Sequence, residues 1–132
     1  MTLVDSNVLI DILSVGPDWF DWSVEQLDRR TSLGPVFFNE IVYEELAVKS
    51  RSEVELDLAL ADLTLQLSPT PKTALFLAGK VFGEHRRRGS SRTSNLPDFF
   101  IGAHAQVTGL PLLTRDVGRY RTYFPNVTLI AP

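Results

Sequence analysis

The chain contains no cysteine among its 132 residues. This absence excludes disulfides, thiolate metal sites and thiol nucleophiles together. No apolar run approaches the roughly 20 residues that span a bilayer. The N-terminus has no basic flank, and Asp5 and Asp11 interrupt its apolar runs, so the sequence does not predict a signal peptide. We therefore expect a cytoplasmic protein without membrane contact.

The first apolar segment is not followed by the pattern G-x-G-x-x-G, which argues against a dinucleotide-binding site of the Rossmann type. The length suits one domain with its own core and is short for two. A hydrophobic fraction of 44% and a mean hydropathy of +0.03 are typical of a globular protein. Because no repeat, linker or low-complexity tract interrupts the chain, we expect a single domain over residues 1–132.

Charge is unevenly distributed along the chain. Residues 1–63 carry thirteen acidic and four basic side chains, whereas residues 64–132 carry three acidic and nine basic ones. The formal balance is thus −9 in the first part and +6 in the second, which predicts a local basic surface. Ten of the thirteen basic residues are arginine, which suits contacts to phosphate.

Apolar segments of strand length alternate with amphipathic segments of helix length. We expect strands at residues 2–4, 36–38, 64–67, 110–114 and 127–130. We expect helices at residues 7–13, 40–48, 54–63, 71–88 and 98–107, and another that starts at residue 19 and ends before Gly34. Such alternation is typical of a parallel sheet with helices on both faces.

Several helix starts carry capping residues. Asp5 or Ser6 can cap the first helix, and Asn39 is a good N-cap for the helix at residues 40–48. Ser52 begins a capping box, and Thr70 precedes a proline suited to the first turn of the next helix.

Four acidic residues have comparable places in this pattern. Asp5 and Asp116 directly follow strands, Glu45 lies on the helix after the second strand, and Asp98 lies in a first helical turn. In a right-handed parallel sheet the strand ends and the following helix starts share one edge. The four carboxylates can therefore meet in one cleft, although a single aspartate at a helix start is more often only a cap.

A cluster of this kind needs a cation. Two carboxylates about 4 Å apart repel each other by roughly 4 kcal/mol at an effective dielectric constant near 20. Either some of them take up protons or a divalent ion holds them together. Ligands that are all oxygen select hard ions, so the cofactor we expect is Mg²⁺ or Mn²⁺.

Four segments then resemble one known family. They are residues 3–11 (LVDSNVLID), 39–46 (NEIVYEEL), 96–105 (LPDFFIGAHA) and 112–116 (LLTRD), followed by Tyr120 and Phe124-Pro125. In this order and spacing they resemble PIN-domain ribonucleases, in particular the VapC-type toxins of type II toxin–antitoxin pairs. Each segment is weak evidence alone, whereas the four together cover nearly the whole chain.

The resemblance implies an α/β fold, a three-layer α/β/α sandwich with a central, mainly parallel, five-stranded sheet. It implies metal ligation by Asp5 and Asp98, with Glu45 and Asp116 completing an acidic catalytic pocket. Glu45 matches better than Glu44 because the family's acid precedes a leucine and lies six residues after a small polar residue.

The resemblance also implies that Asn7 and Thr114 orient the acidic side chains. Ser6 stands where threonine is commoner in the family, and this change keeps the hydroxyl group.

The implied activity is that of an Mg²⁺- or Mn²⁺-dependent endoribonuclease, which hydrolyses single-stranded RNA or the loops of tRNA or rRNA. The implied partners are the RNA substrate, a VapB-type antitoxin and a second copy of the chain in a homodimer. We assign no separate histidine base. His85 is interpreted as a helix-end cation or a solvated residue, and His104 as a residue on another face of its helix.

The basic side chains predict the surface that contacts RNA or an acidic antitoxin. Arg86, Arg87, Arg88 and Arg92 are the first candidates, Arg115 is next, and Arg119 and Arg121 accompany it. Each cation at a helix end contributes only about 0.3–1 kcal/mol through the helix dipole, so three successive arginines exceed what the helix needs. Asp11 is interpreted as a solvated helix residue.

Two other functions stay open at this point. A phosphatase or other phosphoryl-transfer enzyme can be built on a similar α/β fold. However, Asn7 stands where a haloacid-dehalogenase-like phosphatase needs an acid, and the lysine of a receiver domain is missing after the fourth and fifth strands. A PIN fold used only as a non-catalytic interaction module is the second alternative, and the presence of all four acids argues against it.

Overall fold

The computed structural model describes residues 1–14, 18–89 and 96–132. A sheet of five strands lies at its centre, in the order β3-β2-β1-β4-β5, and every neighbouring pair is parallel. The strands are β1 (Thr2–Val4), β2 (Val36–Phe38), β3 (Leu65–Leu67), β4 (Leu112–Leu113) and β5 (Leu129–Ile130). The predicted five-stranded α/β fold is thus confirmed, and the sheet is parallel throughout.

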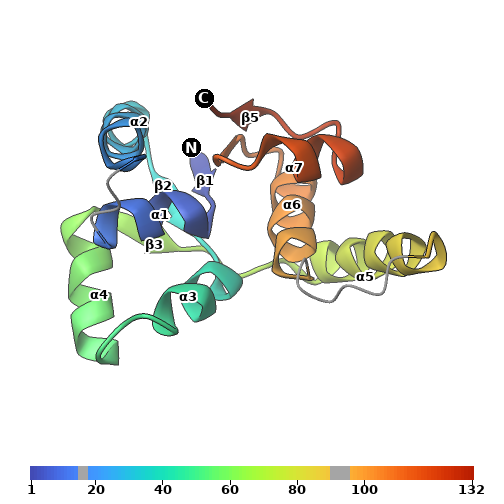
Figure 1. Cartoon of the computed structure of the whole chain (residues 1–132), viewed down its shortest axis with the longest axis horizontal. Coiled ribbons are helices and arrows are strands. Elements are labelled where there is room, and N and C mark those ends of the chain that lie inside the picture. The colour runs from blue at the N-terminus through green and yellow to red at the C-terminus, as the bar shows by residue number, and fades with distance from the viewer. Residues whose placement is uncertain (15–17, 90–95) are drawn as a thin grey trace.

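Seven helices surround the sheet in the described part of the chain (Figure 1). They are α1 (Ser6–Leu13), α2 (Phe20–Leu33), α3 (Glu40–Ala47), α4 (Glu53–Asp62), α5 (Lys72–Arg87), α6 (Leu96–Thr108) and α7 (Val117–Tyr123). Figure 1 shows α1 to α4 on one side of the molecule and α5 to α7 on the other. None of the helices in the described ranges is long and apolar enough to cross a membrane.

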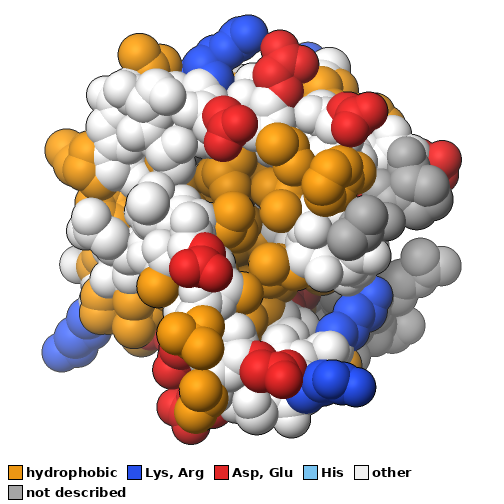
Figure 2. Space-filling view, turned by 90° about the vertical axis from the view of Figure 1, so that its left-hand side faces the viewer, with side chains coloured by type: hydrophobic (Ala, Val, Ile, Leu, Met, Phe, Trp, Pro, Cys, Tyr) orange, Lys and Arg blue, Asp and Glu red, His pale blue; other side chains and the backbone are white. Residues whose placement is uncertain are grey.

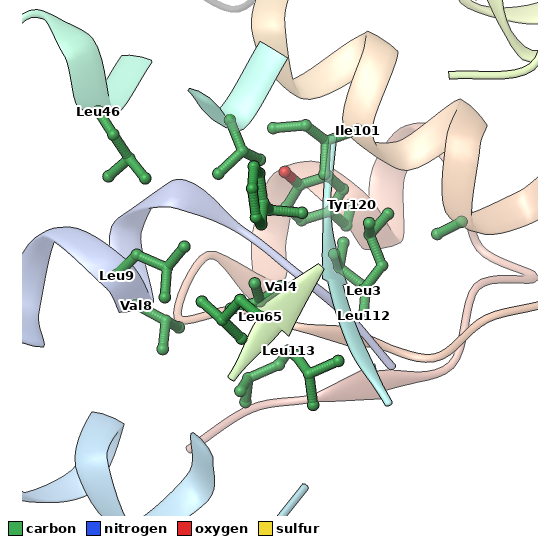
Figure 3. Packing of buried hydrophobic residues seen from close by; sticks show 14 of the residues in the cluster. Leu3, Val4, Val8, Leu9, Leu46, Leu65, Ile101, Leu112, Leu113 and Tyr120 are labelled. Carbon is green, nitrogen blue, oxygen red and sulfur yellow. The ribbon is translucent and has the colours of Figure 1, made fainter. Parts of the chain in front are cut away.

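Strand β1 lies in the middle of the sheet, where both of its faces are covered. Its register pairs Leu3 with Phe37 of β2 on one side and with Leu112 of β4 on the other. Leu3, Val4, Leu112 and Leu113 are fully buried, and Figure 3 shows them packed together at the centre of the core. A strand buried on both faces does not alternate between polar and apolar side chains, and in β1 only the buried Thr2 is polar. Strand β1 also carries Asp5 directly out of the core.

The contact between α6 and the segment after α7 depends on a glycine. A Cβ atom added to Gly102 would lie 2.3 Å from Cδ2 of Phe124, whose ring is buried. The ring therefore packs against the bare backbone of α6. This close approach holds the end of α7 against α6.

The structure corrects some of the predicted elements. Helix α7 was not predicted, because its seven residues are too few to show a clear apolar period. Thr70 does not cap α5, since its hydroxyl contacts the Glu40 carboxylate, and Pro71 itself is the N-cap residue. Asn39 and Ser52 cap α3 and α4 as predicted, each accepting a hydrogen bond from a backbone N–H.

Candidate active site

Asp5 lies at the carboxyl end of β1 and is the N-cap of α1. Its Oδ1 accepts a hydrogen bond of 2.7 Å from the backbone N–H of Ser6, and its Oδ2 accepts one of 2.7 Å from the hydroxyl of Thr114. The residue is only 3% exposed. A carboxylate at this position is fixed by the sheet and the helix together, and so it is a rigid element of the site.

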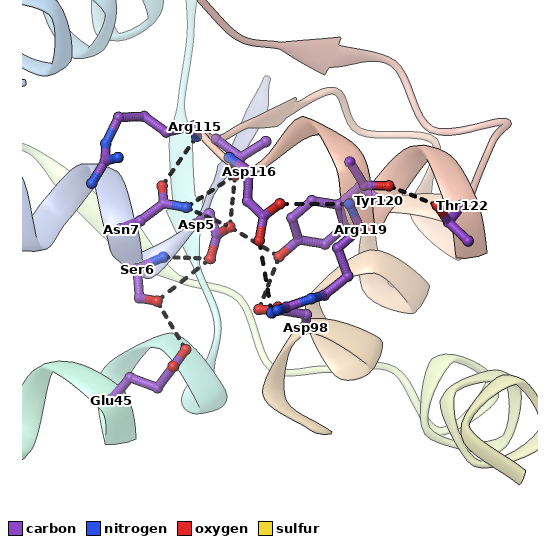
Figure 4. A network of polar contacts seen from close by, with 12 residues as sticks. Asp5, Ser6, Asn7, Glu45, Asp98, Arg115, Asp116, Arg119, Tyr120 and Thr122 are labelled. Carbon is purple, nitrogen blue, oxygen red and sulfur yellow. Dashed lines mark hydrogen bonds and ion pairs between the residues drawn. The ribbon is translucent and has the colours of Figure 1, made fainter. Parts of the chain in front are cut away.

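Tyr120 joins Asp5 to Asp98, as Figure 4 shows. Its hydroxyl lies 2.9 Å from Oδ2 of Asp5 and 3.5 Å from Oδ1 of Asp98. The ring is buried, and burial together with the charges of the two aspartates raises the pKa of Tyr120 well above its ordinary value. Tyr120 is therefore a neutral hydrogen-bond donor between two carboxylates.

Arg119 joins Asp98 to Asp116. Its Nη1 contacts Oδ2 of Asp98 and lies 3.7 Å from Oδ2 of Asp116. Asp116 is also the N-cap of α7, because its side chain accepts from the backbone N–H of Arg119 at 3.5 Å. Two neighbouring residues of α7 thus contact three of the four predicted acids.

Glu45 reaches the same network through Ser6. The Ser6 hydroxyl donates a hydrogen bond of 2.9 Å to Oε1 of Glu45 and lies 3.4 Å from Oδ1 of Asp5. Glu45 is half-buried, whereas Glu44 is exposed. Of the two adjacent glutamates, it is therefore Glu45 that faces the cluster.

Asn7 and Thr114 connect the carboxylates to the backbone. The Asn7 amide donates to Oδ2 of Asp5 at 3.3 Å and to the Thr114 hydroxyl at 3.2 Å, and its Oδ1 accepts from the backbone N–H of Arg115. Thr114 Oγ1 also accepts from the backbone N–H of Asp116 at 3.0 Å. These bonds hold the end of β4 against the start of α1, so Asp5 and Asp116 keep a fixed relation.

The cluster resists full ionisation. Burial, and then the charge of Asp98, raise the pKa of Asp5 from 3.8 to about 6, although the hydrogen bonds from Thr114, Tyr120 and Ser6 oppose this shift. Burial also raises the pKa of Asp98 and that of Glu45. Such a group of carboxylates is stabilised by a cation, which favours the charged form of each.

Comparison with known families gives a match to the model of the PIN domain over residues 2–125. The chain belongs to the PIN-domain family. The match includes all four acidic residues described above, which agrees with the resemblance seen in the sequence.

Several solved structures have the same fold. VapBC2 of Rickettsia felis, bound to a DNA fragment from its promoter, contains a chain with 20% identity and a TM-score of 0.70, and the match covers 99% of this PIN domain and 98% of that chain. The DNA-bound VapBC of Salmonella typhimurium gives 21% identity, a TM-score of 0.69 and coverages of 99% and 98%. VapBC-1 of nontypeable Haemophilus influenzae contains a chain with 17% identity and a TM-score of 0.71, and the match covers 98% of this PIN domain and 96% of that chain. No curated protein matches the chain.

The acidic side chains of this PIN domain suit a hard divalent cation by their chemistry, since every donor atom is oxygen. Within the described ranges, however, no three acidic or histidine side chains are placed so that they could enclose an ion. Mg²⁺ does not require such a cage, because it is usually bound by one or two carboxylates together with water and phosphate. Asp5 and Asp98 are the pair that would hold it, with Glu45 and Asp116 at the edges.

Arg115 does not face the acidic cluster. Its Nε and Nη2 lie 2.6 and 2.9 Å from the two carboxylate oxygens of Asp11, and its guanidinium stacks 5.1 Å from the ring centre of Trp19. Asp11 is buried and also accepts a hydrogen bond of 2.8 Å from Ser23. The interpretation of Asp11 as a solvated residue is therefore wrong. Arg115 directs two of its N–H groups at Asp11 and not at the acidic cluster.

The arginines at the end of α5 lie on the surface, and within the described residues none of them forms an ion pair with the four acids. Arg86, Arg87 and Arg88 are exposed, and the preceding residue, His85, packs against Phe99, the neighbour of Asp98. His85 lies in the last turn of α5, as interpreted, but it is not a solvated residue, because its ring also contacts the hydroxyl of Tyr123. Arg92, another predicted contact, lies outside the described residues.

His104 is remote from the acids. It is fully buried, its Nδ1 lies 3.1 Å from the side-chain nitrogen of Asn39, and burial lowers its pKa. This position on the inner face of α6 suits a structural role and not that of a catalytic base.

Sequence reasoning did not place Arg119 and Tyr120 in the site. From the sequence, Arg119 is interpreted as a basic surface residue, and Tyr120 as part of the pattern that resembles the family. The available signal was their distance from Asp116, since residues three and four positions after an N-cap return to the capped end of the helix. Reading that signal required the short helix α7 to be recognised first.

Proposed function

We propose that this chain is a divalent-metal-dependent endoribonuclease of the VapC type, a toxin that a cognate antitoxin neutralises. The observation that carries the proposal is the buried Asp5, held at the edge of a parallel sheet and facing Asp98 across the Tyr120 hydroxyl. Membership of the PIN-domain family supports nuclease chemistry, and the structures with the same fold come from VapBC complexes.

The side chains then have distinct roles. Thr114, Tyr120 and the Ser6 N–H orient Asp5 so that it can hold the cation together with Asp98. A bound Mg²⁺ or Mn²⁺ would supply Lewis-acid chemistry at the phosphoryl group of the RNA. Glu45, half-buried and with a raised pKa, is the carboxylate that we assign to accept a proton from the attacking water.

The basic end of α5 is the surface that we assign to the RNA backbone. Arg86, Arg87 and Arg88 are exposed at the end of the helix whose His85 packs against Phe99, the neighbour of Asp98, and each can contact a phosphate oxygen. Contacts of this kind carry no sequence information, so the choice of RNA target depends on other residues.

A groove of mixed character supports a protein partner. It lies between α1, α3 and α4 and has a volume of about 380 Å³. Apolar residues such as Ile10, Leu46 and Leu56 line it together with the charged Lys49, Arg51 and Glu55. Figure 2 shows apolar side chains gathered on the left-hand side of the molecule as seen in Figure 1, with both acidic and basic ones around them. We assign this groove to an apolar helix of the antitoxin. The predicted homodimer and cytoplasmic location stay predictions.

RNA cleavage by the purified protein tests the proposal. A single-stranded RNA and a structured RNA are incubated with Mg²⁺, with Mn²⁺ or with a chelator. We expect cleavage only with a divalent ion, and its abolition in Asp5→Asn and Asp98→Asn. Glu45→Gln is expected to slow cleavage by about 10²–10⁴-fold, as for loss of a general base, whereas the matched control Glu44→Gln cleaves like the parent.

The outcomes separate the proposal from its alternatives. Cleavage at the parental rate by folded Asp5→Asn and Asp98→Asn would contradict it. A folded parent that binds RNA but does not cut it under any metal condition would indicate a non-catalytic interaction module. Trapping of a phosphate analogue on Asp5 would indicate a phosphoryl-transfer enzyme.

A further inference from the structure

The position of Arg119 has a consequence for cation binding. The guanidinium contacts Asp98, lies 3.7 Å from Asp116, and is carried by the residue next to Tyr120, whose hydroxyl bridges Asp98 and Asp5. It is therefore a positive charge placed at the acidic pair that would hold a divalent ion. In the described part of the chain, no other arginine or lysine forms an ion pair with any of the four acids.

The geometry of the contact between Arg119 and Asp98 allows it to be broken. Arg119 reaches Asp98 through one nitrogen only, and its side chain remains 35% exposed. A two-pronged arginine–carboxylate pair is held by two parallel hydrogen bonds, whereas a single N–H contact lacks that geometric constraint. Because part of the side chain is already exposed, Arg119 borders solvent while it contacts Asp98.

The charges favour exchange. A guanidinium brings one positive charge, while Asp5 and Asp98 together with Asp116 and Glu45 can present four negative ones. A divalent ion brings two charges and no side chain to order, so it balances the buried Asp5 and the partly buried Asp98 better than Arg119 does. Both cations cannot occupy the same oxygens of Asp98.

We propose that Arg119 is an exchangeable internal cation, which holds Asp98 in the metal-free protein and must leave it when a divalent ion binds. The proposal rests on the metal dependence of the proposed function, but it concerns metal affinity and not the cleavage step. It assigns to Arg119 a regulatory role in loading of the site, so that the chain itself lowers its affinity for metal.

Calorimetric titration of the purified chain with Mn²⁺ tests this competition. We expect Arg119→Gln to bind Mn²⁺ about tenfold more tightly than the parent, equivalent to ~1.4 kcal/mol, because the ion no longer displaces a charged partner. Arg119→Lys keeps the charge and is expected to bind nearly as the parent does. Arg121→Gln, an exposed neighbour on α7, is the matched control and leaves the affinity unchanged.

Equal or weaker Mn²⁺ binding by Arg119→Gln would overturn the inference and leave the proposed nuclease intact. If parent and variants all failed to bind Mn²⁺, the inference would fall together with the metal dependence. Loss of binding in Asp98→Asn shows that the titrated site is this one, and persistence of binding there would contradict both.

A measurement on the parent protein does not depend on how any variant folds. In ¹⁵N NMR spectra of the arginine side chains, addition of Mg²⁺ is expected to shift the Arg119 resonances toward those of a solvated guanidinium. The Arg115 resonances are the internal control and stay in place. If Mg²⁺ shifted the backbone signals of residues 5–7 without moving those of Arg119, the exchange would not occur.

Discussion

Two arginines four residues apart each pair with an aspartate. The two pairs differ in the number of arginine nitrogens that contact the carboxylate and in the side chains around it. Arg115 grips Asp11 with two nitrogens, the Asp11 side chain is 9% exposed, and Ser23 donates a further hydrogen bond to the same carboxylate. Arg119 touches Asp98 with one nitrogen, in a cluster where burial already raises the pKa of the acid.

The difference shows what separates a structural ion pair from a functional one. In the pair of Asp11 and Arg115 the two charges balance each other, and the contacts connect α1, α2 and the end of β4. This pair therefore needs no ligand to neutralise it. The Asp98 pair leaves neighbouring negative charge only partly balanced. A local excess of negative charge among partly buried side chains is typical of a functional site.

Removal of Asp11 is expected to give the largest loss of stability. Asp11→Asn leaves the Arg115 guanidinium without its charged partner and weakens the contact to Ser23, at a cost of about 3 kcal/mol in the free energy of unfolding. Urea unfolding measures this loss. Glu25→Gln, which breaks the exposed pair with Arg29, is the control and should cost less than about 0.5 kcal/mol. An equal effect of the two changes would show that the Asp11 pair does not stabilise the fold.

The stability of the metal-free protein is expected to fall as the pH rises. Because the pKa of Asp5 is about 6 in the folded chain and near 3.8 when unfolded, the folded state holds more protons between these values. The free energy of unfolding therefore decreases from pH 4 to pH 6 by about 2–3 kcal/mol from this group and is then level. Urea unfolding with chelator at pH 4.5 and 7.5 measures the change.

Asp5→Asn is the control for this pH dependence. The variant has no carboxylate to ionise, so its stability should depend less on pH and should exceed that of the parent at pH 7.5. Identical pH profiles for the two proteins would mean that Asp5 is not destabilised by its surroundings.

Loss of the Tyr120 hydroxyl is expected to have the smallest effect. Its hydrogen bond lowers the pKa of Asp5, so Tyr120→Phe should move the acid limb of the pH–rate profile for RNA cleavage toward higher pH. The rate on the plateau should change less than the position of the limb. Tyr123→Phe, which removes a hydroxyl directed at His85, is the matched control. If the acid limb of the pH–rate profile moved equally in both variants, the Tyr120 hydroxyl would not specifically lower the pKa of Asp5.

The order of strands and helices was predictable because each buried strand is marked by an apolar run and most helices by a cap. Asn39 and Ser52 are examples, since the capping residue alone fixes where α3 and α4 begin. The gathering of the four acids at one edge followed from the parallel sheet. Helix α7 was missed because its seven residues show no clear apolar period, and the packing of Phe124 against Gly102 is a contact between distant segments that no local pattern reveals.

The partners of individual charges could not be predicted either. Asp11 and Arg115 are 104 residues apart in sequence, and nothing in the first helix shows that a partly buried arginine will meet it. For the same reason Arg115 and Arg119 looked alike as basic residues. Only their surroundings, Trp19 and Ser23 for one and Asp116 for the other, distinguish them.

The most direct test compares RNA cleavage by Asp98→Asn and Asp11→Asn in Mn²⁺, at a temperature where circular dichroism shows both to be folded. We predict that Asp98→Asn loses cleavage while keeping parental stability, and that Asp11→Asn cleaves at close to the parental rate despite its lower stability. Cleavage by Asp98→Asn at the parental rate would contradict the assignment of the acidic cluster as the active site.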